Sequence, residues 1–224
     1  MQKDAHILVA IDGPAGAGKT TVAKKISQEL DILYLNTGAM YRAAGLHAYK
    51  NHIDPLNEKD VLTFLSSLEV DVKYENGEQH TLLNGQDVTK LLSDPIISEY
   101  ASKISSLVSV REKMVHLQQQ LSKKQSLIID GRDIGTVVLP NATNKFFLDA
   151  KVEERAKRRH FEYLKNGENN ISYEQILTDM KERDYRDTTR EHSPLKKADD
   201  AVYIDSTNMT IDQVVNFILS YFKR

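Results

Sequence analysis

A glycine-rich run near the start of the chain ends in a lysine and a threonine, residue types that at this spacing are suited to binding phosphate. Gly13-Pro14-Ala15-Gly16-Ala17-Gly18-Lys19-Thr20 matches the pattern G-x-x-x-x-G-K-[ST]. Glycines let the backbone wrap an anion, and a following helix adds the positive end of its dipole. We expect Lys19 to reach the β- and γ-phosphates of a nucleotide and Thr20 to offer its hydroxyl to Mg²⁺. The alternative is a glycine-rich turn that binds nothing.

A carboxylate that follows a later apolar run is placed to complete the metal site. Asp130 comes directly after Leu127-Ile128-Ile129, where the carboxyl end of a buried strand would hold the water shell of Mg²⁺. A helix-capping or turn role is the alternative for Asp130. Asp12, just before the glycine-rich run, is predicted to be structural.

The phosphate loop alone does not say what happens to the γ-phosphate. A GTPase would carry an Asn-Lys-x-Asp guanine reader, whereas Asn144-Lys145-Phe146-Phe147 lacks the aspartate and lies in a strand pattern. A large motor or transporter would need more than 224 residues. A kinase for a small molecule fits the length.

Arginines are grouped along the chain, whereas the lysines are scattered. The two clusters consist of Arg155, Arg158 and Arg159, and of Arg183, Arg186 and Arg190. Guanidinium groups bind phosphate in a planar, bidentate manner. Because both clusters flank the polar loop at Gly167–Asn170, they predict a mobile basic lid that closes over phosphates. Salt-bridged solvent faces are the alternative, since Glu153, Glu154 and Asp187 offer partners at helical spacing.

Five short apolar runs, each bounded by polar or turn residues, predict the strands that would position these groups. They are Ile7–Ile11, Ile32–Leu35, Leu127–Ile129, Lys145–Leu148 and Ala201–Ile204. Continuous apolar character is typical of a parallel sheet covered on both faces. Amphipathic helices are predicted after the first strand and at the C-terminus. The alternation favours an α/β fold, with Arg132 and Asp133 at the ligand-binding edge of the sheet.

Local signals predict where two further helices begin and where one ends. Ser109-Val110-Arg111-Glu112 is a capping-box pattern, and Ser172-Tyr173-Glu174-Gln175 is its glutamine variant. Pro194 is predicted to end the second of these helices.

One stretch changes to the period of a β-strand. From Val70 to Val88, apolar and polar residues alternate, and the pairs Asn76-Gly77 and Asn84-Gly85 are strong hairpin signals. We predict a small antiparallel meander inserted into the α/β core. A surface decoration and a cap over substrate are both open as its role.

Composition narrows the class of protein further. The net charge of −2 argues against tight non-specific binding to nucleic acid, and the chain has no cysteine. We find no signal peptide and no apolar run long enough to cross a bilayer. The expectation is a cytoplasmic protein with no nucleic-acid partner and no membrane association, folded as one domain of ordinary globular composition.

Four segments together resemble the bacterial cytidylate kinases of the nucleoside-monophosphate kinase superfamily. They are Ile11–Lys19, Thr37-Gly38-Ala39-Met40-Tyr41-Arg42, Asp130–Val138 and Lys181–Asp187, and the resemblance covers nearly the whole chain. It implies a P-loop fold with a five-stranded parallel sheet flanked by helices, plus the small β insertion. It also implies transfer of the ATP γ-phosphoryl group to CMP or dCMP, with Mg²⁺.

The resemblance implies a role for each matching residue. ATP would be bound by Gly13, Pro14, Ala15, Gly16, Ala17, Gly18, Lys19, Thr20 and Thr21, with Arg155, Arg158 and Arg159 from the lid, and Mg²⁺ by Thr20 and Asp130. The CMP phosphate would be held by Thr37, Arg42, Arg132 and Arg190. The cytosine base would be recognised by Ser102, Arg111 and Asp133. The sugar would be bound by Asp187 and Arg183. Lys19, Arg132, Arg158 and Arg190 would stabilise the transferring group.

We expect a monomer with three moving parts. The core would comprise residues 1–36, 105–150 and 193–224, the acceptor-binding part 37–104, and the lid 151–192. Two other functions stay open: a kinase for another small acceptor such as UMP, and a nucleotide-dependent switch that binds ATP without transferring phosphate.

Overall fold

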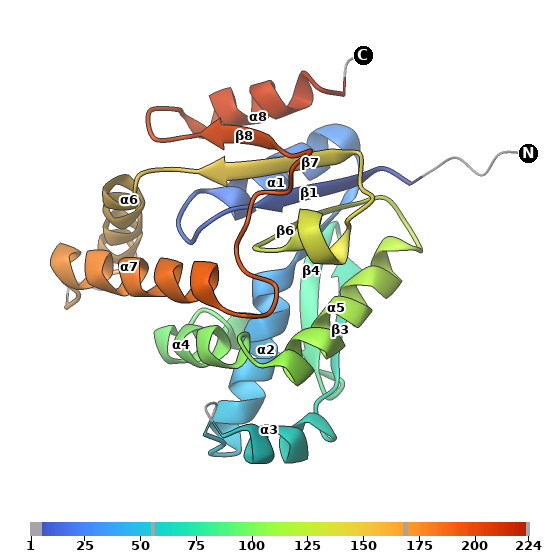
Figure 1. The fold of residues 1–224 in the computed structure, drawn as a ribbon, viewed down its shortest axis with the longest axis vertical. Helices are drawn as coiled ribbons and strands as arrows, with labels where there is room; N and C mark the ends of the chain where they lie inside the picture. Colours follow the sequence, from blue (N-terminus) through green and yellow to red (C-terminus); the bar gives the residue numbers. More distant parts are fainter. Residues whose placement is uncertain (1–5, 55–56, 168–169, 223–224) are drawn as a thin grey trace, which may run out of the picture. The chain divides into compact units, whose positions relative to one another are not determined.

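The computed structural model describes residues 6–54, 57–167 and 170–222 and has the predicted α/β architecture (Figure 1). The larger sheet is parallel, with strand order β2-β6-β1-β7-β8. Its strands are β1 (Leu8–Asp12), β2 (Leu33–Asn36), β6 (Leu127–Gly131), β7 (Asn144–Asp149) and β8 (Val202–Asp205). The five predicted strands are therefore confirmed, with ends that differ by one or two residues.

The described chain divides into two compact units. One comprises Leu33–Leu127 with the segment before Leu8, and the other comprises Leu8–Ile32 and Ile128–Arg224. We call them the acceptor unit and the loop unit, because they carry the residues predicted to bind the acceptor and the phosphate loop. The predicted division into core, acceptor part and lid stays a prediction. Four short segments of the chain that this division includes lie outside the described residues: Met1–Ala5, Pro55–Leu56, Glu168–Asn169 and Lys223–Arg224.

Parallel pairing in the loop unit aligns the carboxyl ends of its strands. Asp12 of β1 pairs with Phe147 of β7, and Asp149 of β7 pairs with Asp205 of β8. Central strands of this unit are buried on both faces, as their continuous apolar sequence predicts.

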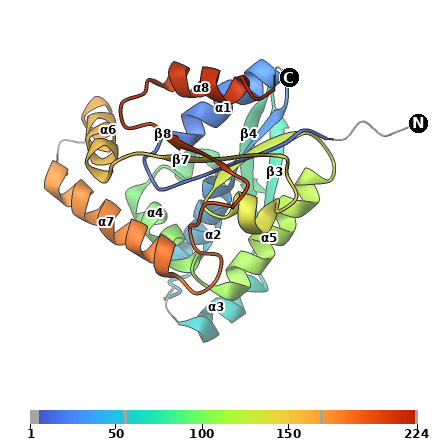
Figure 2. The same ribbon diagram turned by 45° about the horizontal axis from the view of Figure 1, so that its top comes forward.

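The loop unit contains four α-helices among its described residues. They are α1 (Lys19–Leu30), α6 (Val152–Lys165), α7 (Tyr173–Thr189) and α8 (Ile211–Leu219). Figure 2 shows α1 and α8 side by side, and the two helices contact each other. Ala156 of α6 and Ile176 and Met180 of α7 form a small buried cluster that holds this helix pair together. A single π-helical turn, Ile134–Val138, follows β6.

The acceptor unit packs helices against the inserted sheet. Its helices are α2 (Thr37–Lys50), α3 (Glu58–Leu65), α4 (Pro95–Ile104) and α5 (Val108–Ser122), with a 3₁₀ turn at Thr89–Leu91. Helices α2 and α4 approach closely at Gly45, where an added Cβ would lie 2.8 Å from the backbone nitrogen of Ala101.

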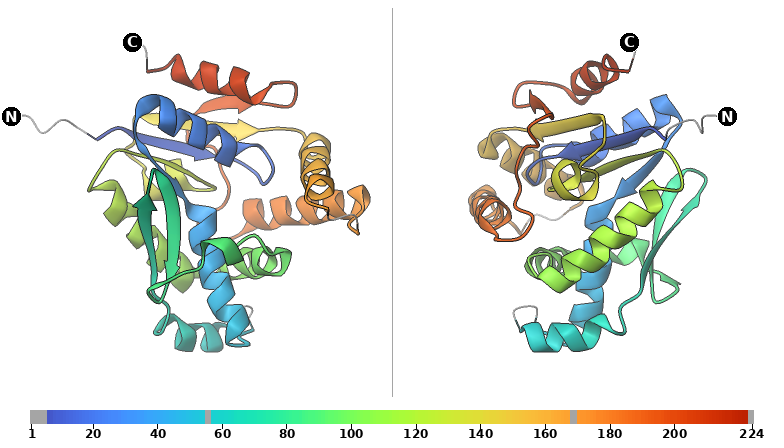
Figure 3. Two further views of the ribbon diagram at one scale, coloured as in Figure 1. Left: turned by 180° about the vertical axis from the view of Figure 1, so that it is seen from behind. Right: turned by 45° about the vertical axis from the view of Figure 1, so that its right-hand side comes forward.

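The predicted meander is confirmed as β3 (Val70–Glu75), β4 (Glu78–Leu83) and β5 (Gln86–Asp87), paired in that order. Both Asn-Gly pairs have positive φ at each residue, as tight hairpin turns between right-twisted strands require. The left-hand view of Figure 3 shows β3 and β4 beside α2, and these strands contact that helix.

Two local predictions are wrong. Ser109 does not cap α5, because the helix begins at Val108 and the carbonyl of Leu107 accepts the first helical bond from Arg111 N, which places Ser109 inside the first turn. Pro194 does not end α7, which stops at Thr189, where Arg190 turns to an extended conformation (ψ 141°) and its Nε donates to the Ser193 carbonyl. The side chain of Ser172 caps α7 as predicted.

Among the described residues, no helix is both long and apolar enough to span a membrane.

Candidate active site

The glycine-rich loop joins β1 to α1, as the motif predicts. Gly13 has φ 146°, and an added Cβ would lie 1.9 Å from the Leu148 carbonyl oxygen, so no other residue fits there. Gly18 is the N-cap of α1 at φ 93°, and no side chain caps this helix. The first-turn N–H groups of α1 therefore have no side-chain acceptor, which is the arrangement that binds an anion.

Lys19 opens α1 with its ammonium group turned back into the loop. Its Nζ donates to the Pro14 carbonyl at 2.6 Å, and the residue is only 6% exposed. Burial lowers the pKa of Lys19 well below its usual value, and the positive charge of Arg132 lowers it further, while Asp130 opposes both. The ammonium group is therefore buried against a backbone carbonyl, and a bound anion would stabilise its charged form.

Thr20 and Asp130 lie together, as predicted for a metal site. The Thr20 hydroxyl donates to Asp130 Oδ2 at 3.0 Å. A hydroxyl beside a carboxylate is an all-oxygen donor set, which fits Mg²⁺ bound by few protein groups and several waters. The residues present thus suit the metal that the resemblance implies.

Asp12 ties the end of β1 to the turn after β6. Its two carboxylate oxygens accept the backbone N–H groups of Ile134 and Gly135 at 2.8 and 2.7 Å. Burial raises the pKa of Asp12 to about 6, although these two hydrogen bonds oppose the shift. This geometry agrees with the predicted structural role: Asp12 holds the segment that carries Arg132 and Asp133.

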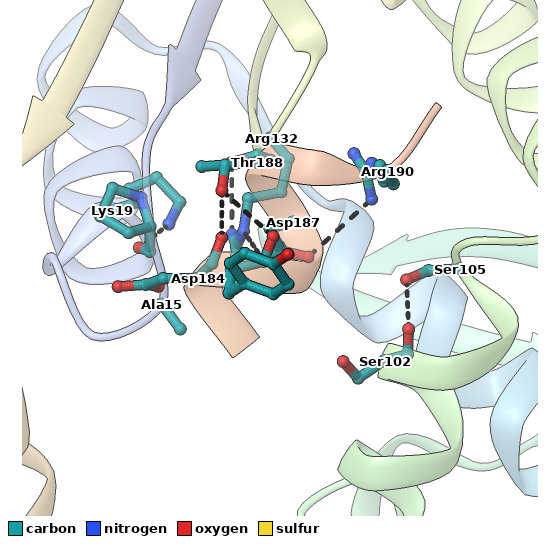
Figure 4. A network of polar contacts seen from close by, with 12 residues as sticks. Ala15, Lys19, Ser102, Ser105, Arg132, Asp184, Asp187, Thr188 and Arg190 are labelled. Atoms are coloured by element: carbon teal, nitrogen blue, oxygen red, sulfur yellow. Dashed lines mark hydrogen bonds and ion pairs between the residues drawn. The ribbon is translucent and has the colours of Figure 1, made fainter. Parts of the chain in front are cut away.

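Arg132 is joined to α7 through Asp187 (Figure 4). Arg132 Nε donates to Asp187 Oδ2 at 2.8 Å, and Arg190 Nη1 lies 3.9 Å from Asp187 Oδ1. Burial would raise the pKa of Asp187, but Arg132, Arg183 and Arg190 outweigh it and the pKa is lowered. The structure thus brings together four residues predicted to bind the acceptor: Arg132, Arg183, Asp187 and Arg190.

Arg155 is part of the protein interior rather than an open lid. Its guanidinium donates to the carbonyl oxygens of Ala150 and Ala15 at 2.8 and 2.9 Å and forms an ion pair with Asp184 at 2.5 Å. Ala15 belongs to the phosphate loop and Asp184 to α7. Arg155 therefore connects the loop to α7 through two kinds of contact.

The other two predicted lid arginines face different neighbours. Arg158 donates to the Ser206 carbonyl at 2.7 Å, whereas Arg159 pairs with Glu162 at 3.0 Å and lies over the Tyr163 ring. In this structure the side chains of Arg155, Arg158 and Arg159 do not converge. Arg159 instead matches the alternative of a salt-bridged solvent face. Their role over ATP stays a prediction.

In the acceptor unit, Thr37 and Arg42 meet at the start of α2. Asn36 caps the helix by accepting from Ala39 N at 3.0 Å, and Thr37 is the buried first residue. Arg42 curls back toward this end, since a Cβ on Gly38 would lie 3.3 Å from its Nη1. A helix N-terminus beside a guanidinium can bind a phosphate group.

Ser102 and Arg111 are linked through Ser105 in the same unit. The buried Arg111 side chain donates from Nη1 to the Ser105 carbonyl at 3.1 Å and lies over the Tyr41 ring, and Ser105 Oγ donates to the Ser102 carbonyl (Figure 4). Ser102 Oγ is buried with no hydrogen-bond partner among the described residues. This hydroxyl is suited to a bound ligand. Asp133 is buried in the loop unit, directly before the π-helical turn.

Sequence reasoning did not identify Asp184 or Ser206. Helical spacing contained a signal for Asp184, which lies one turn after Met180 on the side of α7 that packs against α6. Ser206 had no such signal, because only the fold brings the end of β8 to Arg158.

Comparisons with known proteins identify the family of the chain. A family model described as cytidylate kinase matches residues 9–224. The chain belongs to the cytidylate kinase family. It is 47% identical to the cytidylate kinase of Caldicellulosiruptor bescii over 216 residues, covering 96% of this chain and 95% of that protein. It is 50% identical to that of Lactobacillus johnsonii over 207 residues, covering 92% and 90%.

A solved structure supports the fold alone. An uncharacterised protein from Eubacterium ventriosum shares 16% identity with a TM-score of 0.51, covering 97% of this chain and 98% of that one. The family resemblance inferred from the four motifs is confirmed by the family match, which does not test the roles of single residues.

Asp12 generates a prediction about pH. Since burial raises its pKa from 3.8 to about 6, the folded protein binds more protons than the unfolded chain between these values. The free energy of unfolding that Asp12 contributes should therefore fall as pH rises, by about 2 kcal/mol between about pH 4 and about pH 6. Denaturant unfolding of wild type and Asp12→Asn across this range measures it. A wild-type-minus-variant difference that does not change with pH would contradict the prediction.

Asp184→Asn should remove the negative charge that pairs with the Arg155 guanidinium and leave that guanidinium buried. We expect a loss of unfolding free energy of about 3 kcal/mol, together with weaker ATP binding, because the Ala15 contact loses its support. Asp179→Asn is the matched control, since Asp179 is exposed on the same helix. Calorimetric titration with ATP and denaturant unfolding test both effects, and equal behaviour of the two variants would refute the connection.

Proposed function

We propose that the protein transfers the γ-phosphoryl group of ATP to CMP or dCMP, giving ADP and CDP or dCDP. The observation that carries this proposal is the glycine-rich loop at the uncapped start of α1, where the buried Lys19 ammonium group donates to a loop carbonyl. Membership of the cytidylate kinase family supports the choice of acceptor. A buried ammonium group beside an uncapped helix N-terminus is suited to binding the polyphosphate chain of a nucleotide.

Catalysis in this proposal is positioning and electrostatic stabilisation. An oxygen of the CMP phosphate bonds to the γ-phosphorus while the bond to the β–γ bridging oxygen breaks, and ADP leaves with that oxygen. The acceptor is already anionic, so no general base is required. Lys19 leaves the Pro14 carbonyl for the phosphates, and Arg132, Arg158 and Arg190 stabilise charge on the transferring group. When held by Thr20 and Asp130, Mg²⁺ would supply further neutralisation of phosphate charge.

Each unit contains residues that we assign to acceptor binding. In the acceptor unit, Thr37 and Arg42 bind its phosphate, and Ser102 with Arg111 reads the base. In the loop unit, Arg132 and Arg190 bind the phosphate, Asp133 reads the base, and Asp187 with Arg183 binds the sugar. Cytosine has an amino donor and two ring acceptors, which match a carboxylate, a guanidinium and a hydroxyl.

We also propose a cellular location and an oligomeric state. It describes a monomeric, magnesium-dependent enzyme of cytoplasmic pyrimidine nucleotide metabolism whose substrates are small nucleotides. The small net charge of −2 supports the view that nucleic acid is not a partner.

A coupled assay with ATP, Mg²⁺ and a panel of acceptors tests the proposed function. CMP and dCMP should be phosphorylated, and UMP and AMP should have kcat/KM values at least about tenfold lower, because the base-reading groups would be left unpaired. UMP turnover as fast as that of CMP would reject the base-reading assignment. ATP binding without transfer in a single-turnover experiment would favour a nucleotide-dependent switch.

Lys19→Ala should lower kcat by about 10²- to 10³-fold, because a charge that stabilises the transferring group is lost. Its free energy of unfolding should not decrease, since a buried ammonium group with a lowered pKa is removed. Lys24→Ala is the matched control, as Lys24 is exposed on the same helix. Steady-state kinetics measure the effect, and near-wild-type turnover would refute the role of Lys19.

A further inference from the structure

The β-insertion makes side-chain contacts with the backbone of β2, within the acceptor unit. Gln79 of β4 accepts the Asn36 N–H with Oε1 at 2.6 Å, and its Nε2 lies 3.4 Å from the Asn36 carbonyl oxygen as a donor. The Tyr74 hydroxyl of β3 donates to the Tyr34 carbonyl at 3.1 Å. A side-chain amide that both accepts from and donates to one residue imitates a neighbouring strand.

Hairpin register explains why these two side chains act together. Tyr74 and Gln79 are directly opposite each other in the β3–β4 pair. Their targets, Tyr34 and Asn36, are two residues apart on β2, the spacing at which backbone polar groups point to the same side of a strand. β2 is an edge strand of the larger sheet, so the hairpin covers polar groups that no further strand satisfies.

Gln79 is itself held in place. Its Nε2 donates to Thr81 Oγ1 at 3.2 Å, and Thr81 is fully buried. The backbone N–H of Thr81 donates to Thr89 Oγ1, which in turn donates to Asp87. These contacts restrict the side chain of Gln79 before it meets Asn36, which lowers the entropy cost of the contact.

Asn36 transmits this constraint to the start of α2. Its backbone is held by Gln79, while its side chain caps the helix through Ala39 N. Thr37 follows directly, and Arg42 curls back over the same turn. A displacement at Asn36 would therefore move the helix end at which the acceptor phosphate is proposed to bind.

We propose that Gln79 is a positioning residue for the acceptor phosphate, acting through Asn36 on Thr37 and Arg42. This inference rests on the proposed function, because it assumes that a nucleoside monophosphate binds there. It gives the β-insertion a role that is neither decoration nor cap over substrate: the meander fixes the backbone of the acceptor site from outside.

Gln79→Met tests the inference, because methionine keeps the length of the side chain and removes both contacts with Asn36, along with the hydrogen bond to Thr81. We expect KM for CMP, and the dissociation constant for CMP in calorimetry, to rise about tenfold. KM for ATP should stay within about twofold of wild type, and thermal unfolding should show a cooperative transition. A merely structural role would lower the active fraction and leave KM for CMP unchanged.

Gln86→Met is the matched control, since Gln86 is exposed on β5 of the same sheet, and it should leave both KM values unchanged. Tyr74→Phe should raise KM for CMP less than Gln79→Met, because its target lies two residues further from α2. Equal CMP affinity in wild type and Gln79→Met, or equal rises in KM for CMP and ATP, would overturn the inference. If wild type binds CMP without phosphorylating it, the proposed function fails and the two dissociation constants still decide the role of Gln79. Wild type that does not bind CMP would overturn both.

Discussion

Buried positive charge must be compensated, and in the loop unit this requirement explains the arrangement of side chains around the phosphate loop. Lys19 donates to a loop carbonyl, Arg132 pairs with Asp187, and Arg155 pairs with Asp184. Removing such groups from water without partners would cost several kcal/mol each. Lys19 differs from the two arginines because its hydrogen bond goes to a backbone carbonyl and not to a carboxylate, so an anionic ligand would stabilise its charge.

Helix α7 contributes two aspartates with different neighbours. Asp184 binds the guanidinium that also contacts the phosphate loop, whereas Asp187 binds Arg132 after β6. They are three positions apart (i, i+3), so they lie on neighbouring parts of one helix face. One rigid helix therefore connects the proposed donor and acceptor residues of this unit. A displacement of α7 would therefore shift the proposed donor residues and the proposed acceptor residues together.

Two helix ends differ from the positions that the local sequence signals predict. Capping preferences are worth about 1 kcal/mol, so packing can override them. Ser109 has the residue type of a cap, yet the carbonyl that starts α5 belongs to Leu107. Arg190 leaves α7 four residues before Pro194 to donate to Ser193, which satisfies its guanidinium in part. The cap at Ser172 and the turns at both Asn-Gly pairs were predicted correctly.

The sequence by itself determined the phosphate loop, the five strands, the inserted meander and the family, because each is encoded by neighbouring residues: glycines that need unusual backbone angles, continuous apolar runs and contiguous motifs. It also predicted that Thr20 and Asp130 share one metal site, because strand ends in a parallel sheet share an edge, and the two side chains are in contact. Only the tertiary structure decided the partners of the arginines. Arg155 contacts Ala15 and Asp184, which are 140 and 29 residues away, and a long guanidinium side chain binds whichever carboxylate or carbonyl the fold places within reach. The contact of Gln79 with Asn36 has the same origin, because the identity of a hydrogen-bond partner depends on distance in space and not along the chain.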